Sequence, residues 1–309
     1  MEKRFYPEKV YPERFLNYLK SLLNSTGTRT LHKSPKFVFL CGKRIDEDSG
    51  GNRKLIKDFF AINRKDIICL YAEELFNAQH RKEIDLLTYE HYLAELSDAI
   101  ILFVESFGTA CELGAFSMLK SLSSKMLIIN DIQQQGSNSF INEGPLKKSI
   151  QESTENVIYT DTRTLFSNSQ IDTKLRNLVK SKKCFINRDK NCVNLSAFII
   201  EMLDLIYLLG PITAKELIFV YKALKEFNDF QFGDKTNIQI KNIQISYILE
   251  LLEKANLLKL HNGHYRANPL AYEFCGLMFK AEISRFTNKI RATAISRKFR
   301  HKEGIEECF

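Results

Sequence analysis

Short apolar runs alternate with amphipathic stretches from residue 37 onward. The runs are rich in β-branched and aromatic residues and lack polar alternation, which is typical of strands buried on both faces. They are FVFLCG (37–42), DIICLY (66–71), AIILFV (99–104) and KMLIIN (125–130), and VIYT (157–160) fits a last strand. Between them, helical spacing of apolar residues covers 52–62, 81–96 and 112–122. This alternation predicts right-handed crossovers and a parallel sheet with helices on both faces.

The order of these elements also predicts where a ligand would bind. In an open parallel sheet, ligands bind beyond the carboxyl ends of the strands, so chemistry is expected in the loops after Gly42, Tyr71, Val104 and Asn130. The loop KRIDEDSGGN after Gly42 matches neither GxGxxG nor GxxxxGK. It therefore predicts neither a dinucleotide fingerprint nor a P-loop, although Lys43 or Arg44 could meet a phosphate.

The strand pattern disappears after about residue 162. A basic helical stretch (173–183) leads into the apolar helix 195–210, and Gly210-Pro211 then predicts a helix stop and restart. Two more helical patterns follow, at 212–227 and 241–254, and then LLKLHNGHYRAN (257–268), which has Asn262-Gly263 in a predicted hairpin turn. Helix, turn, helix and hairpin is the order of a winged helix. The stretch 279–302 is helical in pattern and carries 8 Lys and Arg against Glu282 alone.

Composition narrows the class of protein. The 309 residues are 44% hydrophobic and 27% charged, as in an ordinary globular protein, and the length fits two domains. Seven cysteines without a CxxC pair and six histidines without ligand spacing predict neither a disulfide framework nor a metal site, and they fit a reducing cytoplasm. We expect no cofactor and no membrane segment, because the longest apolar stretch is interrupted by Glu201 and Asp204.

Charge is distributed unevenly along the chain. Residues 1–36 carry 8 Lys and Arg against 3 acids, residues 37–150 carry 13 against 16, and residues 151–309 carry 24 against 18. A basic excess on both flanks of a mildly acidic middle indicates that the flanks meet polyanions. The alternative is a solvated basic surface without a partner.

The stretch ESFGTACELGAF (105–116) carries the candidate chemistry. Thr109 and Glu112 have the spacing of a capping box, in which the two residues only begin a helix. That interpretation leaves Glu105 at the strand end unexplained. The alternative is that Glu112 is a nucleophile, kept ionised in the first turn by the helix N-terminus.

The run from Leu86 to Ser117, with FLCG before it and SFINEGP after it, closely resembles retron-associated effectors with a nucleoside deoxyribosyltransferase-like domain. The resemblance is strong over 37–150 and extends in order of elements to the C-terminal winged helix. It implies a Rossmann-like, flavodoxin-like domain with N-glycosidase activity. It also implies a toxic partner in an anti-phage system, encoded beside a reverse transcriptase and its RNA-linked single-stranded DNA.

The resemblance assigns roles to two glutamates. In deoxyribosyltransferases, the glutamate of the strand-to-helix turn attacks C1′ of the sugar, and Glu112 falls on that position. In the same family, sugar hydroxyls are bound by an acidic residue that lies eight positions before an aspartate at the start of the third strand. Asp98 occupies the position of that aspartate here, and counting back eight residues gives Glu90. Both Glu90 and Asp98 could instead be ordinary surface charges. Those enzymes often have an aspartate after the third strand, where this chain has Glu105. The identity of the leaving group is therefore not predicted.

Further substrate-binding candidates lie at the same predicted edge. They are Cys41, Gly42, Glu105, Ser106, Gly108, Thr109 and Asn142. Asn142 precedes a helix entry at Gly144-Pro145, whose free amides would suit an anion or a ribose, although a plain helix entry fits as well. Cys111 adjoins Glu112, but a buried cysteine is commonly only a small apolar residue.

The basic flanks supply the nucleic-acid candidates. Lys241 and Gln244 are expected on the exposed face of the second helix, and Arg266, with His261 and His264, in or near the wing. Phosphate contacts are expected from the C-terminal run of Arg291, Arg297, Lys298, Arg300 and Lys302. The alternative is a small helical oligomerisation domain with a solvated basic rim.

Four segments and one leading function follow. We expect a basic helical segment (1–36), a deoxyribosyltransferase-like domain (37–162), a helical connector (163–209) and a winged-helix domain with a basic C-terminal helix (210–309).

The leading hypothesis is a cytoplasmic N-glycosidase effector acting on a nucleotide, with NAD as the first candidate substrate. It would be restrained by reverse transcriptase and RNA-linked DNA, in an oligomer or larger assembly. An inactive nucleic-acid-binding scaffold or regulator and a base-salvage transferase are the alternatives.

Overall fold

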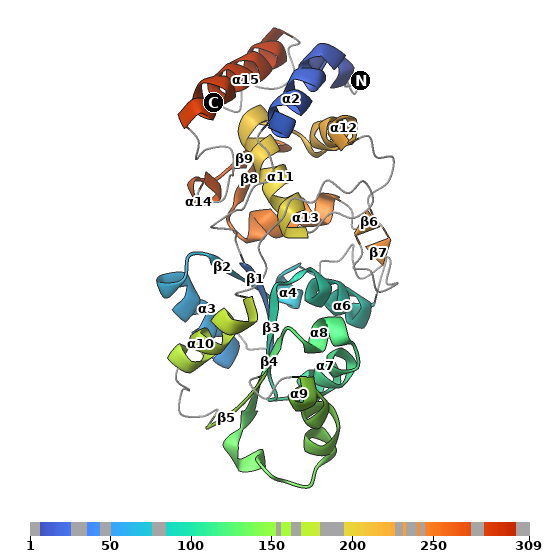
Figure 1. Ribbon diagram of the computed structural model, residues 1–309, viewed down its shortest axis with the longest axis vertical. Coiled ribbons are helices and arrows are strands. Elements are labelled where there is room, and N and C mark those ends of the chain that lie inside the picture. The colour runs from blue at the N-terminus through green and yellow to red at the C-terminus, as the bar shows by residue number, and fades with distance from the viewer. Residues whose placement is uncertain are drawn as a thin grey trace. The chain divides into compact units, whose positions relative to one another are not determined.

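All five apolar runs form strands, and the strands make one parallel sheet (Figure 1). The strands are β1 Lys36–Cys41, β2 Ile67–Leu70, β3 Ala99–Phe103, β4 Met126–Asp131 and β5 Val157–Thr160. Their order across the sheet is β2-β1-β3-β4-β5, and every neighbouring pair is parallel. The predicted α/β class with a Rossmann-like sheet is confirmed.

The protein is represented by a computed structural model that describes most of the chain. The described residues are 7–25, 36–43, 51–75, 85–152, 156–161, 168–179, 195–225, 231–232, 240–241, 245–272 and 281–300. The chain divides into two compact units, Pro35–Lys182 and a second made of Met1–Ser34 together with Lys183–Phe309. The first unit contains the sheet.

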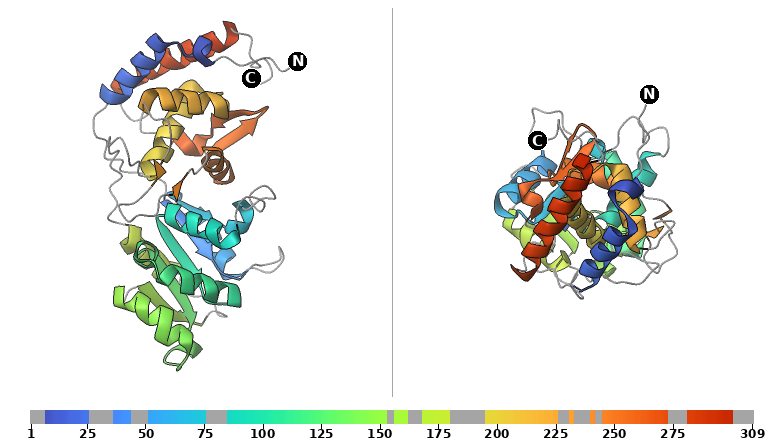
Figure 2. Two further views of the ribbon diagram at one scale, coloured as in Figure 1. Left: turned by 90° about the vertical axis from the view of Figure 1, so that its right-hand side faces the viewer. Right: turned by 90° about the horizontal axis from the view of Figure 1, so that it is seen from above.

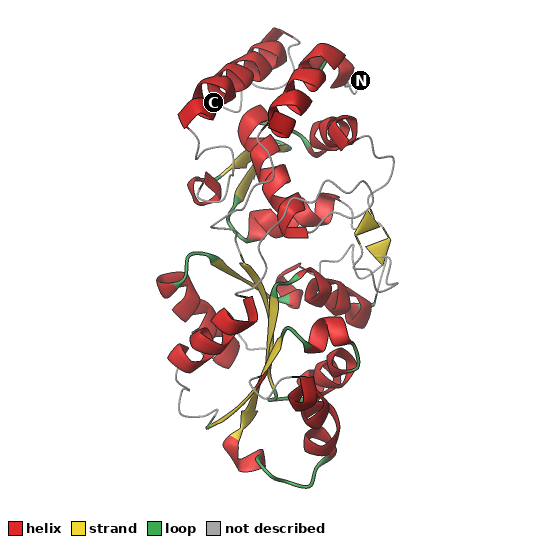
Figure 3. Cartoon of the chain, in the orientation of Figure 1, coloured by secondary structure: helices red, strands yellow, loops and turns green. Residues whose placement is uncertain are grey.

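Helices cover both faces of the sheet (Figures 1 and 3). On one face lie α3 (Asn52–Asn63) and α10 (Asn168–Val179), and on the other lie α6 (Leu86–Leu96), α7 (Phe107–Ser117), α8 (Lys120–Ser123) and α9 (Lys147–Glu152). The short α4 (Ala72–Leu75) follows β2, and the turns η1 (Ile132–Gln134) and η2 (Asn142–Leu146) follow β4. The predicted helix 112–122 was wrong in its bounds, because α7 starts at Phe107 and ends at Ser117.

The side chains of β1 alternate between two apolar layers. Val38 and Leu40 belong to the cluster that α3 and α10 cover. Phe39 points to the opposite face, where its ring lies 6.4 Å from the ring of Phe116 on α7. Period-two alternation in a strand buried on both faces explains why the sequence shows a continuous apolar run.

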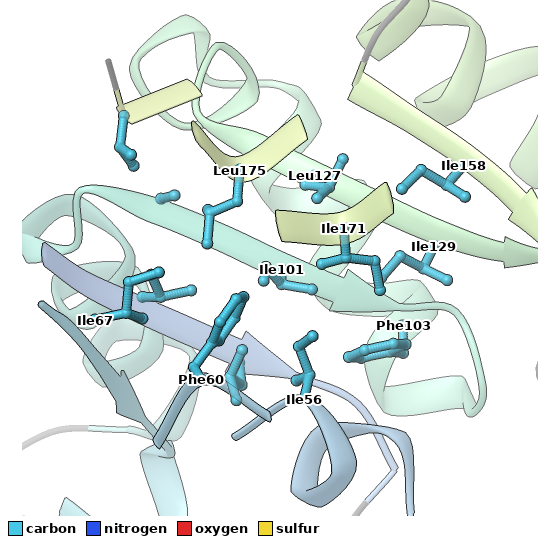
Figure 4. Close-up of a cluster of buried hydrophobic side chains, with 14 residues drawn as sticks. Ile56, Phe60, Ile67, Ile101, Phe103, Leu127, Ile129, Ile158, Ile171 and Leu175 are labelled. Carbon is cyan, nitrogen blue, oxygen red and sulfur yellow. The ribbon is translucent and has the colours of Figure 1, made fainter. Parts of the chain in front are cut away.

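Helix α10 is part of the sheet unit. Ile171, Leu175 and Val179 are buried in the same cluster as the β1, β3 and β4 side chains. Figure 4 shows Ile171 and Leu175 among Ile101, Phe103, Leu127 and Ile129 of the sheet. The predicted α/β domain ended at residue 162, because the strand pattern disappears there. The unit instead runs to Lys182, since the apolar positions of α10 recur at i, i+4 and i+8 and cover the sheet.

The second unit is mainly helical. Its helices are α1 Pro7–Val10, α2 Glu13–Ser25, α11 Leu195–Leu209, α12 Ala214–Lys225, α13 Ile245–Lys254, α14 Pro269–Tyr272 and α15 Ala281–Arg300. Its strands are β6 Gln231–Phe232, β7 Ile240–Lys241, β8 Leu258–His261 and β9 His264–Ala267. The predicted hairpin is confirmed: β8 and β9 pair antiparallel around Asn262 and Gly263, whose φ angles are 48° and 74°. The winged-helix assignment stays a prediction.

Glu216 joins the two ends of the chain within this unit. It is 3% exposed, and its Oε1 accepts the Tyr11 hydroxyl at 3.1 Å and lies 3.4 Å from Lys298 Nζ of α15. Its Oε2 accepts the Thr213 N–H at 2.7 Å, and Thr213 Oγ1 accepts the Glu216 N–H, which makes a capping box at the start of α12. The N-terminal and C-terminal helices therefore belong to one unit (Figure 2).

Over the described part of the chain, no helix is both long and apolar enough to cross a membrane.

Candidate functional site

The strand order places a topological switch point between β1 and β3. The chain passes from β1 outward to β2 and then returns past β1 to form β3. Crossovers that leave in opposite directions open a crevice at the carboxyl ends of the two strands, where α/β proteins bind ligands. Cys41 is the last residue of β1, and Glu105 follows the end of β3 by two residues.

Helix α7 carries Glu112 to this edge, and its start differs from the predicted capping box. The N-cap is Ser106, whose Oγ accepts the Thr109 N–H at 3.3 Å, while Thr109 Oγ1 accepts the Ser106 N–H at 3.0 Å. Thr109 is thus the third helical residue and not the cap. Glu112 lies in the second turn and takes no part in the cap, so the capping interpretation of Glu112 was wrong.

Glu112 is held against β1 rather than against its own backbone. The Cys41 thiol at the end of β1 interacts with its carboxyl group, and its Oε2 is buried without a hydrogen-bond partner among the described residues. A buried, unpartnered carboxylate oxygen is costly for the fold and is typical of sites kept for function.

The charge state of Glu112 also differs from the prediction. Burial, together with the negative charge of Glu90, raises the pKa of Glu112 to about 7, although Cys41 and Arg53 act in the opposite direction. The prediction that the helix N-terminus holds Glu112 ionised was wrong, because the first turn of α7 contains no acidic residue and the dipole effect fades within one turn.

Glu90 is the second carboxyl group of the site. It lies on α6, whose N-cap Asp85 accepts the Thr88 N–H at 2.8 Å. Burial and the charge of Glu73 raise the pKa of Glu90 to about 7, against the opposing effect of Arg53. Two carboxyls that titrate near neutrality can exchange between proton donor and acceptor at cellular pH.

Arg53 is the buried cation of the site, and the sequence analysis did not identify it. It is 6% exposed, and its guanidinium binds both oxygens of Glu73, with Nη2–Oε1 at 2.5 Å and Nη1–Oε2 at 3.2 Å. The guanidinium carbon lies 4.8 Å from the centroid of the Tyr71 ring. Glu73 follows β2 and Arg53 begins α3, so only the parallel pairing of β1 and β2 brings them together.

Gly42 makes room for the Arg53 side chain. A Cβ atom at Gly42 would lie 2.7 Å from Arg53 Cγ and 2.9 Å from its Cδ. The close approach of the arginine stem to the backbone therefore requires glycine at this position. Gly42 acts through Arg53, whereas the sequence analysis listed it as a substrate-binding residue.

Glu105 ties the loop after β1 to the end of β3. Its Oε2 accepts the Lys43 N–H at 3.2 Å, and its Oε1 accepts a short hydrogen bond from Asn52 Nδ2. This carboxylate is engaged by the protein itself. Arg44, the other predicted phosphate contact in that loop, lies outside the described residues.

The remaining substrate-binding candidates have mixed surroundings. The side-chain oxygens of Ser106 and Thr109 are used in the helix cap, and Gly108 is exposed on the first turn of α7. Asn142 Nδ2 donates to the carbonyls of Gln134 (2.7 Å) and Ser137 (2.8 Å), which fixes the loop between η1 and η2. The Asn142 side-chain nitrogen is thus engaged within the protein, while its Oδ1 is buried without a partner among the described residues, and the binding of an anion or a ribose there stays a prediction.

Two residues that are close to the candidate residues in sequence lie outside the site in the structure. Cys111 is exposed on α7. Asp98 accepts the Phe37 N–H at 2.9 Å at the opposite edge of the sheet, so it fixes the register of β1 against β3. Within the described ranges, no group of three or more His, Cys, Asp and Glu side chains could hold a metal ion.

The structure corrects two nucleic-acid candidates. Lys298 is 2% exposed, and its Nζ donates to the carbonyls of Leu209 (3.0 Å) and Pro211 in addition to pairing with Glu216. A buried ammonium with three acceptors cannot bind a phosphate, so this assignment was wrong. Lys241 lies in β7 and not on α13, which begins at Ile245.

The other nucleic-acid candidates are partly exposed or outside the described residues. The Arg291 guanidinium lies 4.3 Å from the Tyr207 ring centroid and that of Arg297 lies 5.8 Å from the Phe15 ring centroid, and both side chains remain partly exposed. Arg266 lies half-buried in β9. Gln244 and Lys302 fall outside the described residues, as do the side chains of Lys241 and Arg300.

Comparison with known proteins gives consistent matches. The family described as STM3845 retron effector protein matches residues 49–260. Over 281 residues, covering 83% of this chain and 86% of the relative, the chain is 28% identical to the Escherichia coli protein "Retron Ec86 putative ribosyltransferase/DNA-binding protein". It is 36% identical over 125 residues to "Retron Ec73 putative ribosyltransferase/DNA-binding protein", also from Escherichia coli, covering 39% of this chain and 40% of that protein.

Proposed function

The chain belongs to the STM3845 retron effector family, and from this premise we propose that its α/β unit is an N-glycosidase that cleaves the base–ribose bond of a nucleotide, with NAD the first candidate. The observation that carries the proposal is the pair Glu90 and Glu112 at the β1/β3 switch point. Both carboxyls have pKa values of about 7, and Glu112 has an oxygen without a protein partner among the described residues.

The chemistry follows from the nucleophilicity of an ionised carboxylate. An oxygen of Glu112 forms a bond to C1′ while the C1′–N bond breaks, and its electron pair leaves with the base. A water molecule then attacks C1′, and its proton passes to a neighbouring carboxylate such as Glu90. The Glu112–sugar bond breaks, and Glu112 is restored as a carboxylate. Glu90 also suits the sugar hydroxyls as an acceptor.

The charge of the site favours a cationic base. Glu73, Glu90 and Glu112 interact electrostatically around the single buried guanidinium of Arg53. Nicotinamide in NAD carries a positive charge at the scissile nitrogen and leaves as a neutral molecule, so it needs no proton from an acid. A carboxylate-rich site therefore stabilises this substrate more than it would a neutral nucleoside.

The relatives support a glycosyl-transfer reaction and a nucleic-acid partner. Both are named for ribosyltransferase activity and DNA binding. We propose that this chain acts as a toxic effector in anti-phage defence and is restrained in a complex with reverse transcriptase and RNA-linked single-stranded DNA. Arg291, Arg297 and Arg266 are the described basic side chains that fit such a polyanion.

A second candidate function is nucleic-acid binding without catalysis, favoured by the basic flanks and the names of the relatives. The deciding experiment incubates the purified protein, alone and with its retron partners, with NAD and common nucleotides, and identifies released bases by mass spectrometry. We expect nicotinamide release by the wild type, none by Glu112→Gln, and unchanged release by the control Glu143→Gln, an exposed glutamate paired with Lys147. Release by Glu112→Gln would exclude the proposed nucleophile.

A further inference from the structure

Glu105 connects the two walls of the switch-point crevice. One wall is the end of β1 with the start of α3, the other is the end of β3 with the start of α7, and the two helices cover opposite faces of the sheet (Figure 1). On the first wall, Glu105 Oε2 accepts the Lys43 N–H at 3.2 Å, and Oε1 accepts a short hydrogen bond from Asn52 Nδ2. On the second wall, the Glu105 N–H donates to Thr109 Oγ1 at 3.1 Å. One half-buried residue therefore holds both walls.

The two donors on the first wall are sequence neighbours of a second contact. Lys43 follows Gly42, and Asn52 precedes Arg53. A Cβ atom at Gly42 would lie 2.7 Å from Arg53 Cγ, so the arginine stem lies directly against the backbone just after β1. Because Glu105 holds the residue next to each member of this contact, it also holds the contact itself.

Arg53 transmits this geometry to the end of β2. Its guanidinium binds Glu73 with Nη2–Oε1 at 2.5 Å and Nη1–Oε2 at 3.2 Å, and its guanidinium carbon lies 4.8 Å from the centroid of the Tyr71 ring. A bidentate pair requires one orientation of the two planes, so the position of the arginine stem decides whether the pair forms. The charge of Arg53 lowers the pKa of both Glu90 and Glu112, so a displaced guanidinium would change the charge balance of the site.

We propose that Glu105 is a positioning residue, whose carboxylate fixes the wall that carries Arg53 relative to the wall that carries Glu112. This inference rests on the proposed role of Glu112 as the nucleophile. Both oxygens of Glu105 accept hydrogen bonds from the protein, so the residue acts through the two walls instead of binding the substrate. Such a role affects the rate strongly, because a misplacement of about 1 Å can slow a reaction about a hundredfold.

The pair of Glu105 and Asn52 allows a compensating exchange. Glu105→Gln replaces one acceptor by a donor, so the side chain can no longer accept from both Lys43 and Asn52. Asn52→Asp alone places two carboxylates against each other, and like charges repel. In the double variant, the amide introduced at position 105 donates to the carboxylate introduced at position 52, while its oxygen accepts the Lys43 N–H. The double variant therefore keeps both hydrogen bonds and the net charge of the wild type.

The first measurement is nicotinamide release by the full-length variants. We expect kcat to fall roughly ten- to a hundredfold in each single variant and to recover to within about threefold of wild type in the double variant. Glu143→Gln, an exposed glutamate paired with Lys147, should behave as wild type. A double variant that stays as slow as Glu105→Gln would assign Glu105 a direct catalytic role and overturn the positioning role.

The second measurement follows the Arg53 side chain by NMR and does not depend on activity. In ¹⁵N-labelled protein, a guanidinium held in a bidentate pair gives slowly exchanging Nη–H signals, and those of Arg53 are assigned from the signals lost in Arg53→Lys. We expect them to disappear in both single variants and to persist in the double variant. Unchanged signals in both single variants, or lost signals with an unchanged kcat, would overturn the inference.

Failure of the proposed function gives a different result. If the wild type releases no base, or if Glu112→Gln releases it, the proposed function fails. The Arg53 signals still report whether the Glu105 hydrogen bonds hold the arginine in place.

Discussion

At the residue scale, the neutral pKa values of Glu90 and Glu112 set the conditions for the proposed reaction. Glu112 attacks only when it is ionised, and its pKa is about 7. We expect kcat/KM for base release to rise from pH 5 to pH 8, with a half-maximal value near pH 7. Steady-state assays across this range measure the acid limb of the kcat/KM profile. A limb near pH 4.5, the ordinary value for glutamate, would contradict the raised pKa.

Glu90→Gln provides the matched variant for this measurement. The charge of Glu90 raises the pKa of Glu112, so its removal should move the acid limb to lower pH. If Glu90 also binds sugar hydroxyls, KM rises in the same variant. The two effects can be separated, because the loss of charge shifts the acid limb along the pH axis, whereas the higher KM lowers kcat/KM at every pH. A limb that moves upward would show that the two carboxyls do not interact as described.

The same two groups also affect stability. Their folded pKa values lie above the ordinary glutamate value of 4.5, so the folded protein binds protons more tightly than the unfolded chain. The stabilisation of the folded protein by protonated Glu90 and Glu112 is fully present below about pH 4.5 and is lost as pH rises through 7. Glu112→Gln has no such loss and should be about 1–3 kcal/mol more stable than wild type at pH 8, with the difference vanishing near pH 4.5. Urea unfolding followed by circular dichroism measures it, and a less stable variant at pH 8 would contradict the sign.

Residue patterns identified the carboxylates of the candidate site but not how α7 begins. T-x-x-E occurs at Thr109–Glu112 and at Thr213–Glu216, and only the second pair forms a capping box. At the first pair, Ser106 already caps the helix one turn earlier. Glu112 could be selected from its place after the third strand. Arg53 could not, because its pairing with Glu73 exists only after β1 and β2 align.

At the element scale, the start of α7 determines where Glu112 points. Ser106→Ala removes the oxygen that accepts the Thr109 N–H, and we expect it to cost about 1 kcal/mol of unfolding free energy. Base release should fall as well, because the helix start positions the whole turn. Ser124→Ala, an exposed serine just after α8, is the control, and it should change stability by less than about 0.5 kcal/mol. Equal stability of the two variants would contradict the observed cap.

The strands were predictable because each is buried on both faces and therefore apolar throughout. The end of the sheet unit was not, because α10 mixes three core residues with basic surface residues. A helix that covers a sheet needs only one apolar face. Ile171 and Leu175 of α10 pack on the part of the sheet face that α3 does not cover. Which part remains uncovered cannot be predicted from the sequence pattern of α10.

At the scale of the whole molecule, the boundary of the sheet unit can be tested with two fragments. Residues 35–182 contain α10 and should give a cooperative urea transition. Residues 35–162 lack Ile171, Leu175 and Val179, which are buried on the sheet, each worth about 1.5–3 kcal/mol. This loss is a large part of the roughly 5–15 kcal/mol that stabilises a domain, so the shorter fragment should not fold. Equal transitions for both fragments would place α10 outside the unit.

The second unit is assembled from both ends of the chain, and this has a consequence for synthesis on the ribosome. The sheet unit is complete once residue 182 has emerged, whereas Tyr11 contacts Glu216, and Glu216 in turn pairs with Lys298, which is made much later. At ordinary translation speeds the 116 residues from 182 to 298 need roughly 6–23 s. During that interval the apolar side chains of the first helices that are buried in the folded unit, Val10, Tyr11, Phe15 and Leu19, lack the partners that cover them.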